Sequence, residues 1–228
     1  MKSRTFFNCF FGLGILVLVL SACTTSPIWS DVVGSAYSGK YSASHDPTAL
    51  APINPAFRYL RVEVSHSPAA LLVLGYVDAH PDGPVEVWYS SKGEVIRLQN
   101  GRVVGTAGLA FDWTRVWFDV LPSWQSVPPS GLNMTRWHDE KKGYIAGTQQ
   151  RLQLQAVSPP TAWPSKLPKL MVSDYLWFQE TDLGVAADKL PPSVYALGTY
   201  RGQRRIVYSE QCLSFELCLK LQLWPPQA

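Results

Sequence analysis

The chain has 228 residues, of which 46% are hydrophobic and 16% are charged, and its formal net charge is +3. A chain of this length and composition can bury one substantial core, which excludes disorder throughout and favours a single domain. Once the predicted signal peptide with Lys2 and Arg4 is removed, 18 basic residues face 17 acidic ones, so no nucleic-acid partner is implied.

Residues 1–22 form a predicted secretion signal. Lys2 and Arg4 give it a basic start, and an apolar run follows from Phe6 to Leu20. The alternative is a transmembrane anchor, but a run of about fifteen residues is shorter than the roughly twenty that cross a bilayer.

The apolar run ends in Leu20-Ser21-Ala22-Cys23, which resembles a bacterial lipobox. The resemblance implies that the Cys23 thiol receives a diacylglyceryl group, that cleavage occurs before Cys23, and that the new amino terminus is acylated. Three acyl chains would hold the protein on the membrane surface without a spanning segment. Thr24 follows Cys23, where some sorted lipoproteins have aspartate. By the same resemblance, the absence of aspartate there implies that the protein is sorted to the outer membrane and faces the periplasm.

Residues 23–56 are rich in serine, alanine, glycine and proline and show no sustained period. This composition predicts a flexible tether between the lipid anchor and the folded part. We expect residues 57–228 to form a single β-rich periplasmic domain.

Two hairpin turns define the clearest local structure, the segment from Val85 to Leu109. Lys92-Gly93 ends one strand, and Asn100-Gly101 is the strongest two-residue hairpin signal because both turn positions need positive φ. Gly105 and Gly108 in the return strand indicate a bulge or a close approach of another backbone.

Other segments with a period of two, or with continuous apolar character, also predict strands. Arg201-Gly202-Gln203 predicts a further hairpin, whereas Trp137 to Gly143 predicts a charged turn. One short helix is expected near Thr181 to Lys189. The predicted strands lie at 60–64, 70–77, 85–89, 95–96, 102–104, 114–121, 151–157, 176–178, 195–200, 205–208 and 213–223.

These elements predict a mainly β fold. An antiparallel, meander-rich sheet, or two such sheets, would form a sandwich or a partly open barrel with at most one or two short helices.

The four cysteines have different expected fates. Cys9 leaves with the signal and Cys23 takes the lipid, so Cys212 and Cys218 remain in an oxidising compartment and are expected to form a disulfide. A single straight strand would hold these two about 20 Å apart, whereas a disulfide needs Cα atoms within roughly 7 Å. Either the chain bends within Leu213 to Leu217, or both thiols stay free on one face.

The histidines do not have the spacing of a helical metal site, and no nucleotide-binding or nucleophile-elbow motif is present. We therefore expect no metal, no cofactor and no catalytic residue. The one local constellation with acid–base potential is His138-Asp139-Glu140. The histidines are His45, His66, His80 and His138.

Tryptophan occurs nine times, and its flat indole can either stack on a sugar ring or fill a β core. Four tryptophans with polar or proline-rich neighbours are the candidates for glycan or partner contact. They are Trp113, Trp117, Trp124 and Trp137.

The lipobox and four further segments together resemble the YjbF/GfcB family of group 4 capsule and exopolysaccharide lipoproteins. The match covers Phe57 to Leu109. The segments are the apolar strand Ala70-Leu71-Leu72-Val73-Leu74-Gly75, Trp88-Tyr89-Ser90, Asn100-Gly101-Arg102-Val103-Val104 and Thr106-Ala107-Gly108-Leu109.

The resemblance implies an antiparallel β-protein anchored to the outer membrane that acts in polysaccharide assembly or export. A β-barrel outer-membrane protein would be a partner, the polysaccharide a ligand, and no catalytic residue carries over. Arg102, directly after the turn, would be available to a partner or glycan, or would be a solvated edge charge.

Three functional hypotheses follow. The first is a non-catalytic accessory or binding component of capsule or exopolysaccharide export. The second is a scaffold lipoprotein that binds an outer-membrane β-barrel without contacting glycan. The third is a hydrolase or metal enzyme centred on His138.

Overall fold

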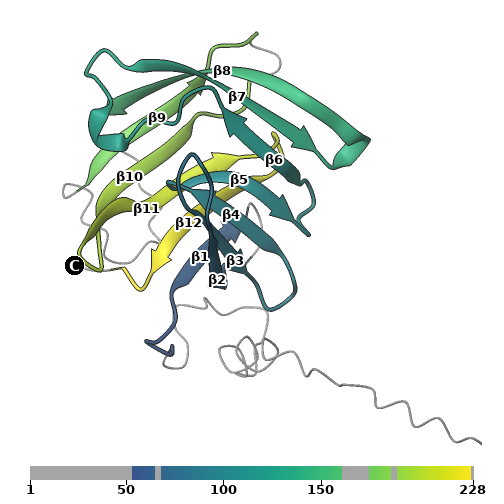
Figure 1. Cartoon of the computed structure of the whole chain (residues 1–228), viewed down its shortest axis with the longest axis vertical. Coiled ribbons are helices and arrows are strands. Elements are labelled where there is room, and N and C mark those ends of the chain that lie inside the picture. Colours follow the sequence, from purple (N-terminus) through teal and green to yellow (C-terminus); the bar gives the residue numbers. More distant parts are fainter. Residues whose placement is uncertain (1–52, 65–67, 161–174, 186–188, 227–228) are drawn as a thin grey trace, which may run out of the picture.

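The computed structural model describes residues 53–64, 68–160, 175–185 and 189–226. The predictions on the signal peptide, on Cys23 and on most of the tether lie outside these residues. The described residues form one twelve-stranded antiparallel sheet, which confirms the predicted mainly β class (Figure 1). Its strands are β1 (Tyr59–Val64), β2 (Ala70–Asp78), β3 (Val85–Tyr89), β4 (Val95–Gln99), β5 (Arg102–Ala107), β6 (Trp113–Phe118), β7 (Leu132–Glu140), β8 (Ile145–Val157), β9 (Leu176–Asp182), β10 (Ser193–Tyr200), β11 (Gln203–Cys212) and β12 (Cys218–Trp224).

The sheet is almost a simple meander, with one long-range pairing. Its order is β5-β4-β3-β2-β1-β12-β11-β10-β9-β8-β7-β6, so only the β1–β12 pair joins strands distant in sequence. The sheet curls until its two end strands, β5 and β6, lie side by side (Figure 1). The result is a nearly closed barrel, the second of the two architectures predicted.

The hairpin turns lie where the sequence predicts them. Asn100 and Gly101 take φ values of 50° and 81° between β4 and β5, and Arg201 and Gly202 take 50° and 75° between β10 and β11. The ladder between β4 and β5 shifts register beside Gly105, which confirms the predicted bulge.

Two local predictions are wrong because strand pairing extends further than the sequence pattern indicates. Thr181 and Asp182 pair with β8 and end strand β9, and residues 183–185 are not helical. Trp137 to Glu140 belong to β7, and the turn is confined to the short 3-10 helix η3 (Lys142–Tyr144) and its flanks. No helix in the described ranges has the length and apolar character needed to cross a membrane.

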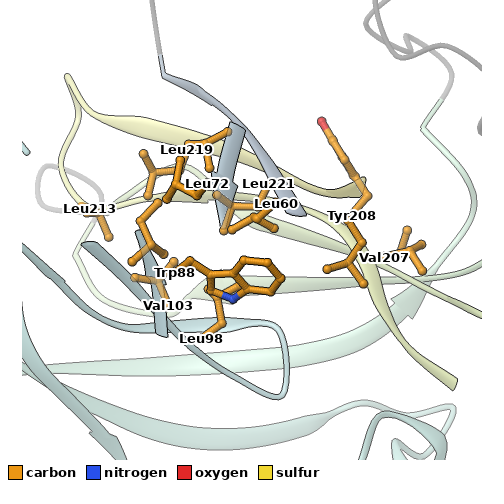
Figure 2. Packing of buried hydrophobic residues seen from close by; sticks show 14 of the residues in the cluster. Leu60, Leu72, Trp88, Leu98, Val103, Val207, Tyr208, Leu213, Leu219 and Leu221 are labelled. Atoms are coloured by element: carbon orange, nitrogen blue, oxygen red, sulfur yellow. The ribbon is translucent and has the colours of Figure 1, made fainter. Parts of the chain in front are cut away.

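The largest hydrophobic cluster draws residues from β1 to β6 and from β9 to β12. Trp88 is completely buried and lies among aliphatic side chains from neighbouring strands (Figure 2). Full burial of a large aromatic stabilises a fold by about 2–3 kcal/mol relative to exposure. The labelled neighbours are Leu60, Leu72, Leu98, Val103, Leu219 and Leu221.

A disulfide joins Cys212 to Cys218. These residues are opposite one another in the β11–β12 ladder, with Cα atoms 3.9 Å apart and sulfurs 1.99 Å apart. The chain bends between them, and the Leu213 amide donates to the Leu217 carbonyl at 2.9 Å. The period of two from 213 to 223 therefore spans a hairpin and does not mark one continuous strand.

Candidate functional site

A buried ion pair links the first residue of β5 to the opposite wall of the barrel. Arg102 is 1% exposed, and its Nε donates to Glu180 Oε1 at 2.5 Å. The other Glu180 oxygen accepts from the Tyr195 hydroxyl at 2.9 Å. Burial, reinforced by the Glu180 carboxylate, raises the pKa of Tyr195 well above its usual value, so Tyr195 stays a neutral donor.

Gln211 ties the edge of β5 to β11 across the interior. Its Nε2 donates to the Gly101 carbonyl and its Oε1 accepts from the Val103 amide, both at 2.9 Å. Because β5 is an end strand of the sheet, the Val103 amide has no ladder partner on that side, and Gly101 lies in the turn that precedes β5. The Gln211 amide takes the place of a neighbouring strand.

A second buried group crosses β7, β8 and β9. Arg136 donates through Nε and Nη2 to Gln150 Oε1 at 2.9 and 2.7 Å, and Gln150 Nε2 donates to Asp182 at 3.1 Å. Burial lowers the pKa of Arg136, while the nearby Glu180 and Asp182 oppose that shift. Together with the Arg102–Glu180 pair, this group brings two arginines and the carboxylates of Glu180 and Asp182 into the interior.

His138 lies in the same interior, where solvent does not reach it. Its ring stacks on Trp113 with centroids 4.3 Å apart, and its Nε2 lies 3.1 Å from Glu140 Oε1. Burial lowers the pKa of His138 because it disfavours the charged ring, and the Glu140 contact offsets this only in part. His138 is 3% exposed. Within the described ranges, no group of three His, Cys, Asp or Glu residues could hold a metal ion.

A different arrangement lies on the outer face of the barrel. Trp117 and Trp137 are opposite one another in the β6–β7 ladder, with ring centroids 6.2 Å apart and planes inclined by 9°. Both are half-buried. Side chains alternate between the two faces of a strand, and Arg136 and His138, on either side of Trp137, occupy the interior, so Trp137 and its partner Trp117 lie on the outer face. The guanidinium carbon of Arg115 lies 4.8 Å from the centroid of the Trp117 ring.

Polar side chains from β8 extend this outer surface. Gln149 is directly opposite Trp137, and Arg151 is opposite Thr135 in the next row. Gln149 and Arg151 are exposed and alternate with buried β8 residues, so they share the outer face with the tryptophans. We call Trp117, Trp137, Arg115, Gln149 and Arg151 the outer aromatic platform. It combines flat apolar rings with several hydrogen-bond donors, and β6 places it at the end of the sheet.

The platform contains two of the four predicted contact tryptophans. The expected exposure of Trp113, Trp124 and Arg102 is wrong, because all three are buried. The proline- and serine-rich loop around Trp124 folds inward through the 3-10 helix η2 (Trp124–Ser126), and the Trp124 ring covers the Arg102 guanidinium at 3.8 Å. Trp124 Nε1 also donates to the Asn100 carbonyl at 2.9 Å.

The sequence pattern did not reveal the interior network around Arg102, in which Arg102 donates to Glu180 and the Tyr195 hydroxyl lies within hydrogen-bond distance of Glu180 and Gln211. Glu180, Tyr195 and Gln211 lie on strands and point inward, where the period of two calls for apolar residues. A polar residue at such a position signals a buried network. It does not identify the partner, because these contacts join strands far apart in sequence.

Comparison with solved structures shows a likeness of fold. No family model matches the sequence, and no curated protein matches it. Among solved structures, the hypothetical lipoprotein YmcC from Escherichia coli K12 superposes with a TM-score of 0.51. The two chains are 13% identical, and the match covers 82% of this chain and 91% of YmcC. The likeness shows a shared fold.

Proposed function

We propose that this chain is an outer-membrane lipoprotein, anchored through acylated Cys23, that acts as a non-catalytic accessory or binding component in capsule or exopolysaccharide assembly or export. The lipobox and the resemblance to the YjbF/GfcB lipoproteins support the anchor and the pathway. The similar solved structure is that of a hypothetical lipoprotein, which agrees with this assignment at the level of fold.

The outer aromatic platform is the observation that carries the binding role. Sugar rings present apolar C–H faces that stack on indoles and hydroxyl groups that hydrogen-bond to amide and guanidinium groups. Trp117 and Trp137 offer two nearly parallel rings, and Arg115 and Gln149 add donors beside them. The pairing of strands β6 and β7 fixes the geometry, so little side-chain freedom is lost on binding.

A binding assay with matched variants tests this role. Purified protein would be run in affinity gels containing the surface polysaccharide of the source cells. We expect Trp117→Ala with Trp137→Ala to abolish the retardation, while Tyr144→Ala, which removes an aromatic that is 94% exposed elsewhere on the barrel, leaves it unchanged. Equal retardation of all three proteins would contradict glycan binding by the platform.

A deletion strain separates the accessory role from the scaffold role. Deletion should reduce surface polysaccharide, and the platform variant should fail to restore it. Normal restoration by that variant, together with co-purification of a β-barrel protein, would favour the scaffold that binds no glycan.

The anchor has its own test. Cys23→Ser should prevent incorporation of labelled palmitate and leave an unprocessed precursor. Normal labelling of that variant would contradict lipidation at Cys23.

A further inference from the structure

The β10–β11 hairpin carries three arginines within five residues at its tip. Arg201 and Arg204 are exposed, and Arg205 is half-buried. Arg201 occupies a turn position with φ of 50°, which asparagine or glycine adopts at less cost. Backbone strain of this kind occurs at functional sites, which makes the Arg201 side chain a candidate for a functional contact.

This hairpin lies beside the start of β1. The Arg201 guanidinium donates to the Phe57 carbonyl at 3.2 Å and reaches the Pro55 carbonyl at 3.5 Å. The described chain begins at Ile53, so the arginines lie at the end of the barrel where the chain arrives from Cys23. The 29 residues that separate Cys23 from Ile53 span at most about 100 Å however they run.

The hairpin and the start of β1 bring several arginines together. Arg58 and Arg205 share a single carboxylate, that of Glu86, to which both donate hydrogen bonds. Arg204 makes no ion pair with any residue in the described ranges. With Arg201, the group holds four arginines and one glutamate, and Asp78 and Asp82, at and after the end of β2, lie at the same end of the barrel.

We propose that this arginine hairpin is a membrane-facing surface that binds the headgroups of anionic phospholipids. The inference rests on the proposed lipid anchor, which would keep this end of the barrel near a bilayer. Guanidinium groups form bidentate hydrogen bonds with phosphate, and exposed arginines near an anionic surface add to membrane attraction. Binding would orient the barrel with the hairpin toward the bilayer.

Vesicle sedimentation tests the surface without the anchor. The mature chain carrying Cys23→Ser would be mixed with phosphatidylglycerol–phosphatidylethanolamine vesicles and, separately, with phosphatidylcholine vesicles. We expect binding to the anionic vesicles alone, weakened by salt. Because this chain carries no lipid, the result does not depend on whether Cys23 is acylated or the platform binds glycan.

Matched variants locate the surface. Arg201→Gln with Arg204→Gln should weaken binding to anionic vesicles about tenfold or more. Arg115→Gln with Arg151→Gln removes the same charge from another face and should leave vesicle binding unchanged. Arg204→Gln alone avoids the Arg201 contact to β1 and should give an intermediate loss.

Three results would overturn the proposal. They are no binding of the parent chain to anionic vesicles, an equal loss in both double variants, and retention of vesicle binding when the hairpin is altered. Loss of polysaccharide retardation, without loss of vesicle binding, in the hairpin variant would assign these arginines to an acidic glycan.

Discussion

Replacing Gln211 with leucine should destabilise the protein by about 2–4 kcal/mol. The amide of Gln211 is the partner of two backbone groups at the edge of β5, the Val103 amide and the Gly101 carbonyl. A buried polar group that loses its partner costs about 1–3 kcal/mol. Two backbone groups are affected here, and Gln211 also donates to Ser209 Oγ at 2.9 Å and accepts from the Tyr195 hydroxyl at 3.3 Å. Val103 is buried, so water cannot replace the lost acceptor at its amide.

Gln222 provides the matched control. It is buried like Gln211, with 1% of its surface exposed against 4%, but neither of its amide atoms has a hydrogen-bond partner in the described structure. Gln222→Leu removes polar atoms that were already unpaired, so its effect on the free energy of unfolding should be neutral or stabilising.

Urea unfolding of both variants gives the two free energies, and hydrogen exchange reports the edge of β5 directly. We expect the Val103 amide to exchange faster in Gln211→Leu and at the wild-type rate in Gln222→Leu. Equal stability of the two variants would refute the idea that a side chain replaces the missing strand beside β5.

Three further predictions follow from the interior and the β11–β12 hairpin. Arg102→Met should cost about 3–5 kcal/mol of stability because it leaves Glu180 buried without its cation, and adding Glu180→Gln should recover much of that loss; no recovery would argue against a direct pair. The pKa of His138 is lowered from 6.5 by burial, so the unfolded chain takes up this proton first and stability should fall as pH falls through 6.5. His138→Gln should remove that part of the pH dependence, and an unchanged profile would contradict it. Reduction of Cys212–Cys218 should lower the free energy of unfolding by about 2 kcal/mol, from the entropy of a short closed loop, and an unchanged urea midpoint would contradict this.

Local signals in the sequence predict the turns and the class of the fold. Asn100-Gly101 and Arg201-Gly202 both form the expected hairpins, because a two-residue turn depends on backbone conformations that few residues adopt. The β1–β12 pair could not be predicted, since nothing in either strand specifies a partner at the far end of the chain. That pair, with the curl of the sheet, makes the barrel.

The candidate site was harder to predict because the barrel places polar residues inside and tryptophans outside. Arg136 and His138 alternate with Trp137 on β7. A half-buried strand usually has apolar residues inside and polar residues outside, but here the polar residues point inward and the indole points outward. The sequence of this segment therefore resembles a loop. Polar flanks suggested exposure for all four tryptophans. Polar neighbours in sequence do not determine whether a side chain is exposed. The loop around Trp124 is rich in proline and serine, yet it folds over Arg102 and buries the indole.

The binding constant for the surface polysaccharide, compared between the wild type and Trp117→Ala with Trp137→Ala, tests the proposed role most directly. Titration calorimetry on both proteins measures the constant, with Tyr144→Ala as the control. Unchanged urea unfolding of the double variant would show that any loss of affinity comes from the outer aromatic platform and not from unfolding. We expect at least about a tenfold loss of affinity in the double variant, from the removal of two stacking faces, and none in the control. Wild-type affinity in the double variant, or no binding by the wild type, would contradict it.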